Sequence, residues 1–255
     1  MLEARFLPGS SDLDWLNVSL APTAILLAKL PRPGAVKTRL TGPGGLSAAE
    51  AAEVALAMLC CSVERLAARW TVVVAITPDG TGDRLLAALG GVLPAEIAAR
   101  LQFVDQGEGD LGVRLGRAWR AVGSSSPVAF FGADTPDLPA SHLEAIERVL
   151  VSSDVAIGPT PDGGYWTLAS RDHRPGLLAR VDWGSESVYD QTCDRAAAGG
   201  LRLESLPGWP DVDRPADVIA LRERLAGTHP DLANDAVLAR LAERLGTILA
   251  SSDLA

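Results

Sequence analysis

A short stretch near the start of the chain gathers positive charge around a tight turn. It reads KLPRPGAVKTRL over residues 29–40; its cations are Lys29, Arg32, Lys37 and Arg39, and its turn residues are Pro31, Pro33 and Gly34. Such a loop can present cations and backbone N–H groups to phosphate oxygens. The Walker A pattern is absent. We interpret the segment as a phosphate-binding loop of another kind, with an ordinary solvated basic loop as the alternative.

Two acidic segments follow apolar or extended stretches. Asp134 comes just after the apolar run 127–131 (PVAFF), and Asp211 and Asp213 flank Val212. Alternation along an extended chain puts both members of the second pair on one side. Magnesium binds one or two carboxylates together with phosphate oxygens. Asp134, Asp211 and Asp213 are therefore predicted to hold Mg²⁺ or Mn²⁺, and without a cation they would repel one another.

Each acidic segment also has a structural interpretation, which the sequence leaves open. Asp134 suits a turn. Asp137 would cap the helix that follows it, and Asp213 would cap the helix that begins at Pro215, because Asp favours helix N-termini.

A glycine-rich turn precedes two aromatic residues in the segment GPTPDGGYWT, residues 158–167. Asp162, Gly163 and Gly164 are good turn residues, and glycines also let a substrate approach the backbone closely. Tyr165 and Trp166 are expected on opposite faces of a strand, one of them toward the site. Arg114, one turn into the helix that Asp110 caps, is expected to face a phosphate.

The remaining reactive residue types do not form a site. The histidines His142, His173 and His229 lack partners at metal-ligand spacing and are expected at the surface. The cysteines Cys60, Cys61 and Cys193 form no CxxC pattern and are expected to be buried thiols in a reducing compartment. No GxSxG motif is present, which argues against hydrolysis by a catalytic triad.

Strands alternate with helices along most of the chain. The predicted strands are 23–30, 71–77, 101–104, 127–131, 154–158, 164–169 and 201–206, and the predicted helices are 47–69, 82–89, 94–99, 110–122, 139–151, 185–198, 215–225 and 230–249. The first helix carries a capping box, Ser47 with Glu50. This alternation predicts an α/β fold with a mainly parallel sheet covered on both faces, in which ligands lie beyond the carboxyl ends of the strands.

Composition bounds the class of protein. The chain has 255 residues, 47% of them hydrophobic, and a net charge of −9. We expect an extension at 1–22, one nucleotide-binding domain at 23–226 and a helical tail at 227–255. An acidic balance argues against nucleic acid as a partner. The chain has neither the apolar run of a membrane span nor the pattern of a secretory signal, so a cytoplasmic location is expected.

Five motifs together resemble a known family. In chain order they are the basic loop, GADTPDL at 132–138, GPTPDGGY at 158–165, WGSES at 183–187 and DVD at 211–213. The order and spacing resemble bacterial proteins of the glycosyltransferase-A (GT-A) type related to 2-phospholactate guanylyltransferase and the molybdenum-cofactor nucleotidyltransferases. The likeness spans about residues 23–225. Gly184-Ser185 departs from the Ser-Thr usual in that family.

The resemblance implies a three-layer, Rossmann-like nucleotide-diphospho-sugar transferase fold with a mixed sheet. It implies nucleotide binding by the basic loop, including Lys29, Pro33, Gly34, Lys37 and Arg39, with metal on Asp134, Asp211 and Asp213. It places the acceptor or sugar near Asp162, Gly163, Gly164 and Tyr165, with Ser185 as a substitute hydroxyl.

The expected activity is metal-dependent nucleotidyl transfer to a small phosphorylated or hydroxyl acceptor, in which Lys37 and Asp134 are the catalytic residues. Glycosyl transfer from a nucleotide sugar and non-catalytic nucleotide binding remain alternatives, because one fold hosts several functions. The base, the acceptor and the oligomeric state are not determined.

Overall fold

The computed structural model of the chain describes residues 21–42, 44–123, 127–227, 232, 235–250 and 252. Nearly all of the predicted extension at 1–22 therefore lies outside the described residues. The same holds for the predicted start of the last helix at residue 230.

A seven-stranded sheet organises the fold, in the order β3-β2-β1-β4-β6-β5-β7. Its strands are β1 (Thr23–Lys29), β2 (Val72–Thr77), β3 (Gln102–Asp105), β4 (Val128–Gly132), β5 (Val155–Pro159), β6 (Tyr165–Ser170) and β7 (Leu203–Ser205). Strand β6 pairs antiparallel with β4 and β5, and the other pairs are parallel. The predicted mainly parallel mixed sheet is confirmed, with most strand ends within two residues of those expected.

Helices follow the strands as predicted. They are α1 (Ala48–Ala67), α2 (Gly82–Gly90), α3 (Ala95–Ala98), α4 (Leu111–Val122), α5 (Ala140–Ser152), α6 (Val188–Ala198), α7 (Pro215–Ala226) and α8 (Ala236–Leu249), with 3₁₀ turns η2 (Thr38–Leu40) and η3 (Pro175–Leu178). The capping box of Ser47 and Glu50 is present at the start of α1. Asp110 caps α4 by accepting a hydrogen bond from the Val113 N–H at 2.8 Å.

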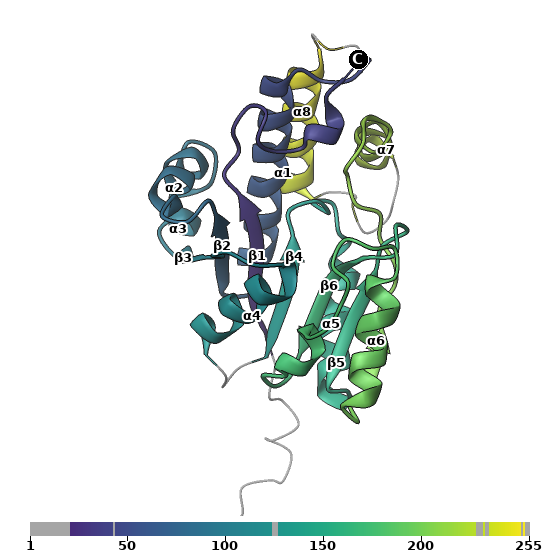
Figure 1. The fold of residues 1–255 in the computed structure, drawn as a ribbon. Coiled ribbons are helices and arrows are strands. Elements are labelled where there is room, and N and C mark those ends of the chain that lie inside the picture. Colours follow the sequence, from purple (N-terminus) through teal and green to yellow (C-terminus); the bar gives the residue numbers. More distant parts are fainter. Residues whose placement is uncertain are drawn as a thin grey trace, which may run out of the picture.

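The sheet separates two apolar clusters, because successive side chains of a strand point to opposite faces. Leu26 and Phe131 belong to the larger cluster, which also takes in residues of α1, α5 and α8. Ile25 and Phe130 belong to the other, with residues of α4 and α6. The result is a three-layer fold with helices on both faces of the sheet (Figure 1).

The C-terminal helix α8 is part of the core. It packs beside α1 (Figure 1), and its buried side chains, such as Leu241 and Leu245, join the larger apolar cluster. Within the described residues, no helix combines the length and the apolarity that crossing a bilayer requires.

The surface prediction for the histidines is wrong where the structure describes them. His142 is buried, with ring-centroid distances of 5.7 Å to Trp166 and 5.3 Å to Trp209, because it lies on the inward face of α5. His173 is half-buried against Trp119, and residue 229 lies outside the described residues. Two cysteines are buried as expected, but Cys193 is partly exposed.

Candidate active site

The basic loop after β1 turns one lysine inward. Val36 and Leu40 are buried and anchor the loop on either side. Between them, Lys37 adopts a left-handed backbone conformation, with φ 46° and ψ 40°. Such a conformation costs a non-glycine residue about 1–3 kcal/mol and persists only where the surroundings hold it. Here the surroundings are the contacts of its own ammonium group.

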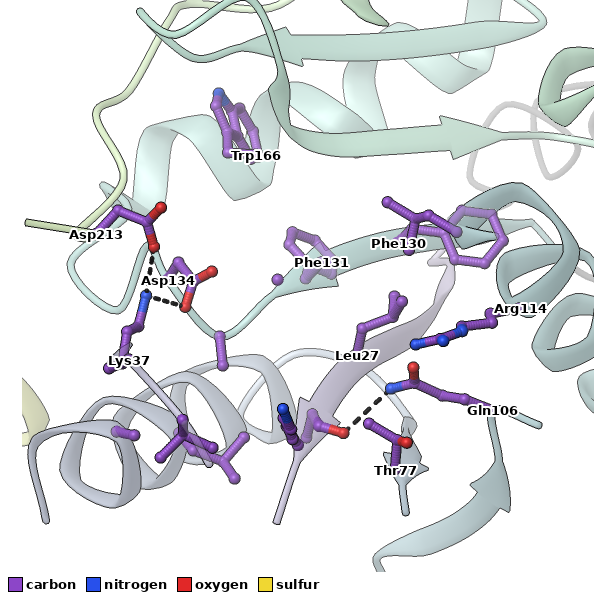
Figure 2. Close-up of a pocket in the computed structure, with 18 of the residues that line it drawn as sticks. Leu27, Lys37, Thr77, Gln106, Arg114, Phe130, Phe131, Asp134, Trp166 and Asp213 are labelled. Carbon is purple, nitrogen blue, oxygen red and sulfur yellow. Dashed lines mark hydrogen bonds and ion pairs between the residues drawn. The ribbon is translucent and has the colours of Figure 1, made fainter. Parts of the chain in front are cut away.

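The Lys37 ammonium bridges two acidic segments (Figure 2). Its Nζ lies 2.5 Å from Oδ1 of Asp134 and 3.2 Å from Oδ1 of Asp213, and it donates to the Val212 carbonyl at 2.5 Å. These contacts use all three N–H donors of the group. The Lys37 side chain is only 9% exposed, whereas that of Asp134 is 46% exposed. One buried cation therefore holds two carboxylates that remain open to solvent.

Arg39 completes the positive side of this cluster. It binds the second carboxylate oxygen of Asp213 at 2.7 Å, and its own side chain is 70% exposed. Burial acts to raise the pKa of Asp213, but the charge of Lys37 and the hydrogen bonds from Lys37 and Arg39 outweigh burial and hold that pKa below its usual range.

Asp211 faces carboxylates instead of cations. Burial raises its pKa, and the negative charge of Asp162 raises it further, with smaller contributions from Asp213 and Asp134. Between Asp211 and Asp213, the side chain of Val212 is buried and its N–H donates to the Asp134 carbonyl at 2.9 Å. The buried valine directs the two neighbouring aspartates away from the core, on one side of the segment.

A cavity of about 670 Å³ lies at the carboxyl ends of β1, β2 and β4. Cavities of roughly 300–1,000 Å³ are typical of small-molecule sites. Seven of the predicted site residues line it: Lys29, Lys37, Arg39, Arg114, Asp134, Tyr165 and Asp213. The tertiary structure thus gathers cations and carboxylates from distant parts of the chain at one opening.

Seven other predicted residues do not line this cavity: Pro33, Gly34, Asp162, Gly163, Gly164, Ser185 and Asp211. The turn has a structural task of its own. The Asp162 carboxylate accepts hydrogen bonds from the Thr160 hydroxyl and the Gly164 N–H. Gly163 has φ 87°, and a Cβ there would lie 1.8 Å from the Glu186 carbonyl oxygen. The Ser185 hydroxyl donates to the Asp182 carbonyl within its own loop.

Two capping interpretations are wrong. Asp137 does not cap α5; it is fully buried, forms an ion pair with Arg224 at 2.6 Å and accepts from the Trp209 indole N–H at 3.2 Å. Asp213 does not cap α7 either. The Asp217 carboxylate accepts from the N–H groups of Asp213 and Arg214 instead. In both positions the carboxylate forms an ion pair with a distant segment instead, Asp137 with Arg224 and Asp213 with Lys37 and Arg39.

Neither Ser185 nor Ser187 caps α6 with its side chain. The hydroxyl oxygens of Ser185 and Ser187 lie 3.0 Å apart, and both accept a hydrogen bond from Nε2 of Gln191. The helix consequently begins at Val188, three residues later than predicted.

Sequence reasoning missed several residues that line the cavity. Thr77 ends β2, Gln106 follows the end of β3, and Phe130 supplies aromatic surface. Trp166 lines the cavity as well as Tyr165, whereas only one of these two was expected to face the site. Gln106 directly follows a strand, as the basic loop and the Asp134 turn do. That position was the available signal, although a lone glutamine has no motif to accompany it.

Comparisons with known proteins agree with this fold. A family model described as an uncharacterized protein conserved in bacteria (DUF2064) matches residues 62–185. That range contains Gln106, Asp134 and the turn at 162–164, but neither the basic loop nor the segment 211–213. No curated protein matches the chain.

Solved structures extend the likeness to nearly the whole chain. A proposed nucleotide-diphospho-sugar transferase from Desulfovibrio desulfuricans G20 is 26% identical, with a TM-score of 0.73, over 89% of this chain and 96% of its own. The 4-diphosphocytidyl-2C-methyl-D-erythritol synthase of Anaerococcus prevotii DSM 20548 is 12% identical, with a TM-score of 0.50, over 81% of this chain and 100% of its own. The chain therefore has the nucleotide-diphospho-sugar transferase fold that the sequence predicted.

Proposed function

We propose that the protein is a metal-dependent transferase that acts on a nucleoside triphosphate and moves its nucleotidyl group to a small phosphorylated or hydroxyl acceptor. The observation that carries this proposal is the cavity at the strand ends, where Lys29, Arg39 and Arg114 accompany the Asp134–Lys37–Asp213 cluster. Cations and carboxylates at one opening suit a substrate that brings phosphate and metal together.

The donor set fits a hard divalent cation. Beyond the effect of burial, the charges of Asp162, Asp213 and Asp134 raise the pKa of Asp211, whereas Lys37 and Arg39 act on Asp213. Among the described residues, no three such side chains gather closely enough to hold a metal by themselves. Magnesium characteristically takes one or two carboxylates and completes its shell with water and substrate phosphates. Of the three predicted ligands, Asp134 and Asp213 line the cavity and would hold the ion there, and when bound it would neutralise charge on the phosphoryl oxygens.

The residues of the chain would position the reacting groups. Lys29 and Arg39 would bind the phosphates at the cavity rim, and Lys37 would keep Asp134 and Asp213 oriented. The acceptor oxygen would form a bond to the α-phosphorus as the bond from that phosphorus to the bridging oxygen breaks, and pyrophosphate would leave with the electron pair. No protein nucleophile takes part, so catalysis would rest on positioning and electrostatics.

One observation favours a second candidate, glycosyl transfer from a nucleotide sugar. The Desulfovibrio structure, similar over 89% of this chain, carries the name of a nucleotide-diphospho-sugar transferase. The same cavity would then hold the diphosphate of the nucleotide sugar, and the sugar would lie toward the acceptor. The two reactions differ in their products, since nucleotidyl transfer releases pyrophosphate and glycosyl transfer releases a nucleoside diphosphate.

The test is a thermal-shift panel of nucleoside triphosphates and nucleotide sugars, with Mg²⁺ or with EDTA, followed by product analysis. A ligand at 100 times its Kd stabilises the folded state by about 2.7 kcal/mol. We expect a shift that needs both nucleotide and Mg²⁺. Stabilisation by a nucleotide without any product would show a protein that binds nucleotides but is not a transferase. No stabilisation by any compound would contradict the proposal.

A further inference from the structure

The chain contains two lysines, Lys29 and Lys37, and both line the cavity. Every other basic side chain apart from the histidines is an arginine. An ammonium group is a compact charge with three donors, whereas a guanidinium group is a planar fork. Of the two, the ammonium group is the one that resembles a small metal ion. Lys37 therefore brings to the carboxylates a cation that an ion can replace.

Lys37 uses the carboxylate oxygens on which a divalent ion would depend. Its Nζ is bound by Oδ1 of Asp134 and by Oδ1 of Asp213, and Arg39 binds Oδ2 of Asp213. Among the described residues, none donates to the fourth oxygen, Oδ2 of Asp134, and Figure 2 shows it pointing away from Lys37. An ion that binds both aspartates must therefore replace at least one contact of a basic side chain.

The structure leaves a route for this exchange. Two cations on the same pair of oxygens repel each other strongly where water is excluded, and the Lys37 side chain is buried. Asp134 and Asp213 are both reachable from solvent, so an ion can approach them from the cavity without passing Lys37. The four-carbon stem of lysine is flexible. The ammonium group can therefore leave while Val36 and Leu40 keep the loop anchored.

We propose that Lys37 exchanges with a divalent ion: its ammonium group holds Asp134 and Asp213 in place until the ion replaces it, and then binds phosphate. This inference rests on the proposed metal-dependent function and adds the form in which the site takes its substrate. An ion alone leaves the displaced ammonium group without a partner. An ion that arrives with a polyphosphate brings that partner, because phosphate oxygens bind cations. The site therefore takes metal and phosphate together, as one complex.

The first experiment measures the binding of Mn²⁺ alone, by electron paramagnetic resonance, to the wild type and to Lys37→Met. The variant should bind Mn²⁺ about ten-fold more tightly, because the ion no longer displaces a charge-assisted contact. A variant that merely damaged the site would bind Mn²⁺ less tightly. A folded Lys37→Met protein that binds Mn²⁺ no better than the wild type, or not at all, would overturn the exchange.

Lys29→Met is the matched control. It removes the same charge from the same cavity, but the described ion pairs of Asp134 and Asp213 are with Lys37 and Arg39. Lys29 is exposed, so its charge is screened by salt, and the affinity for Mn²⁺ should stay within about two-fold of wild type. Equal gains in the two variants would show a general effect of charge and overturn the exchange.

A second measurement needs no variant. Acetylation of amino groups followed by mass spectrometry reports Lys29 and Lys37 separately, and the chain has no other lysine. Mn²⁺ alone should raise the acetylation rate of Lys37 and leave that of Lys29 unchanged, because the ion releases Lys37 from its carboxylates. Tripolyphosphate added with the Mn²⁺ should lower the Lys37 rate again. An unchanged Lys37 rate at a Mn²⁺ concentration that occupies the site would overturn the proposal.

Inorganic tripolyphosphate with Mg²⁺ separates failure of this inference from failure of the proposed function. Calorimetry should find it bound about ten-fold more weakly by Lys37→Met than by the wild type, the opposite of the effect on Mn²⁺ alone. Equal affinities would overturn the binding of phosphate by the released ammonium group. If the wild type binds tripolyphosphate but Lys37→Met gains no affinity for Mn²⁺, only the exchange falls. If the wild type binds neither tripolyphosphate nor any nucleotide with Mg²⁺, the proposed function falls, and the Mn²⁺ titrations still decide whether Lys37 competes with the ion.

Discussion

Lys37 lies between Asp134 and Asp213, with its ammonium nitrogen 2.5 Å from one carboxylate and 3.2 Å from the other. The lysine belongs to the loop after β1, Asp134 to the turn after β4, and Asp213 to the segment before α7. One cation thus joins three segments that meet only in the folded chain. The predicted repulsion among bare carboxylates is therefore wrong for the Asp134–Asp213 pair, because the protein supplies its own counter-ion.

The first prediction concerns stability. Asp134→Asn removes a negative charge that pairs with the buried ammonium of Lys37, so it should lower the free energy of unfolding by about 1 kcal/mol. This value is that of a charge-assisted hydrogen bond, reduced because the carboxylate is exposed to solvent. Urea unfolding measures the change. The control is Glu144→Gln, which weakens an ion pair with Arg69 at 3.4 Å and should have almost no effect. A variant as stable as wild type would contradict the proposed role of Lys37 as counter-ion.

A second prediction tests phosphate binding. Arg39→Gln should weaken the affinity for Mg²⁺-nucleotide by about ten-fold, the value of one charge-assisted hydrogen bond. Arg32→Gln is the matched control, since it removes the same charge from the same loop at a residue that does not line the cavity. Calorimetry should find its affinity within about two-fold of wild type, because an exposed charge that makes no contact in the cavity is screened by physiological salt. Equal losses in both variants would indicate a long-range charge effect and not a contact.

The third prediction concerns the glycine turn. Gly163→Ala should destabilise the fold by about 2 kcal/mol or more, because the site combines φ 87° with a carbonyl oxygen 1.8 Å from the new Cβ. Gly80→Ala shares a positive φ, 71°, but has nothing within 4 Å of the new Cβ. The difference between their urea midpoints isolates the steric clash. Similar midpoints would show that Glu186 moves aside at little cost.

The fourth prediction concerns the buried Asp137–Arg224 ion pair. Arg224→Met leaves the fully buried Asp137 carboxylate with one neutral hydrogen-bond donor, the Trp209 indole. The free energy of unfolding should therefore fall by about 3 kcal/mol or more. Adding Asp137→Asn should recover part of that loss, because the uncompensated charge is then gone. Arg202→Met, at an exposed pair with Asp154, should change stability by less than about 1 kcal/mol. A double variant less stable than Arg224→Met would contradict this account.

Patterns in the sequence predicted the layers of the fold and the edge of the sheet at which the cavity lies. Apolar runs and turn residues are local signals, and they placed the seven strands and the capping box of Ser47. Parallel strands end at one edge of a sheet, so the segments after β1 and β4 were expected to meet there. Motif order added a family likeness, and with it the carboxylates of the segment 211–213.

The pairing of individual side chains depends on contacts that exist only in the folded chain. Lys37 was predicted to contact phosphate, yet its ammonium is used by Asp134, Asp213 and the Val212 carbonyl. Asp137 was read as a helix cap, but the crossing of α7 brings Arg224 to it. Gln106 carries no motif, and its fixed amide depends on carbonyls of two other strands. Periodicity and capping are determined by residues close together in the sequence. These partners lie more than thirty residues apart in the chain, and strand order and helix packing bring them together.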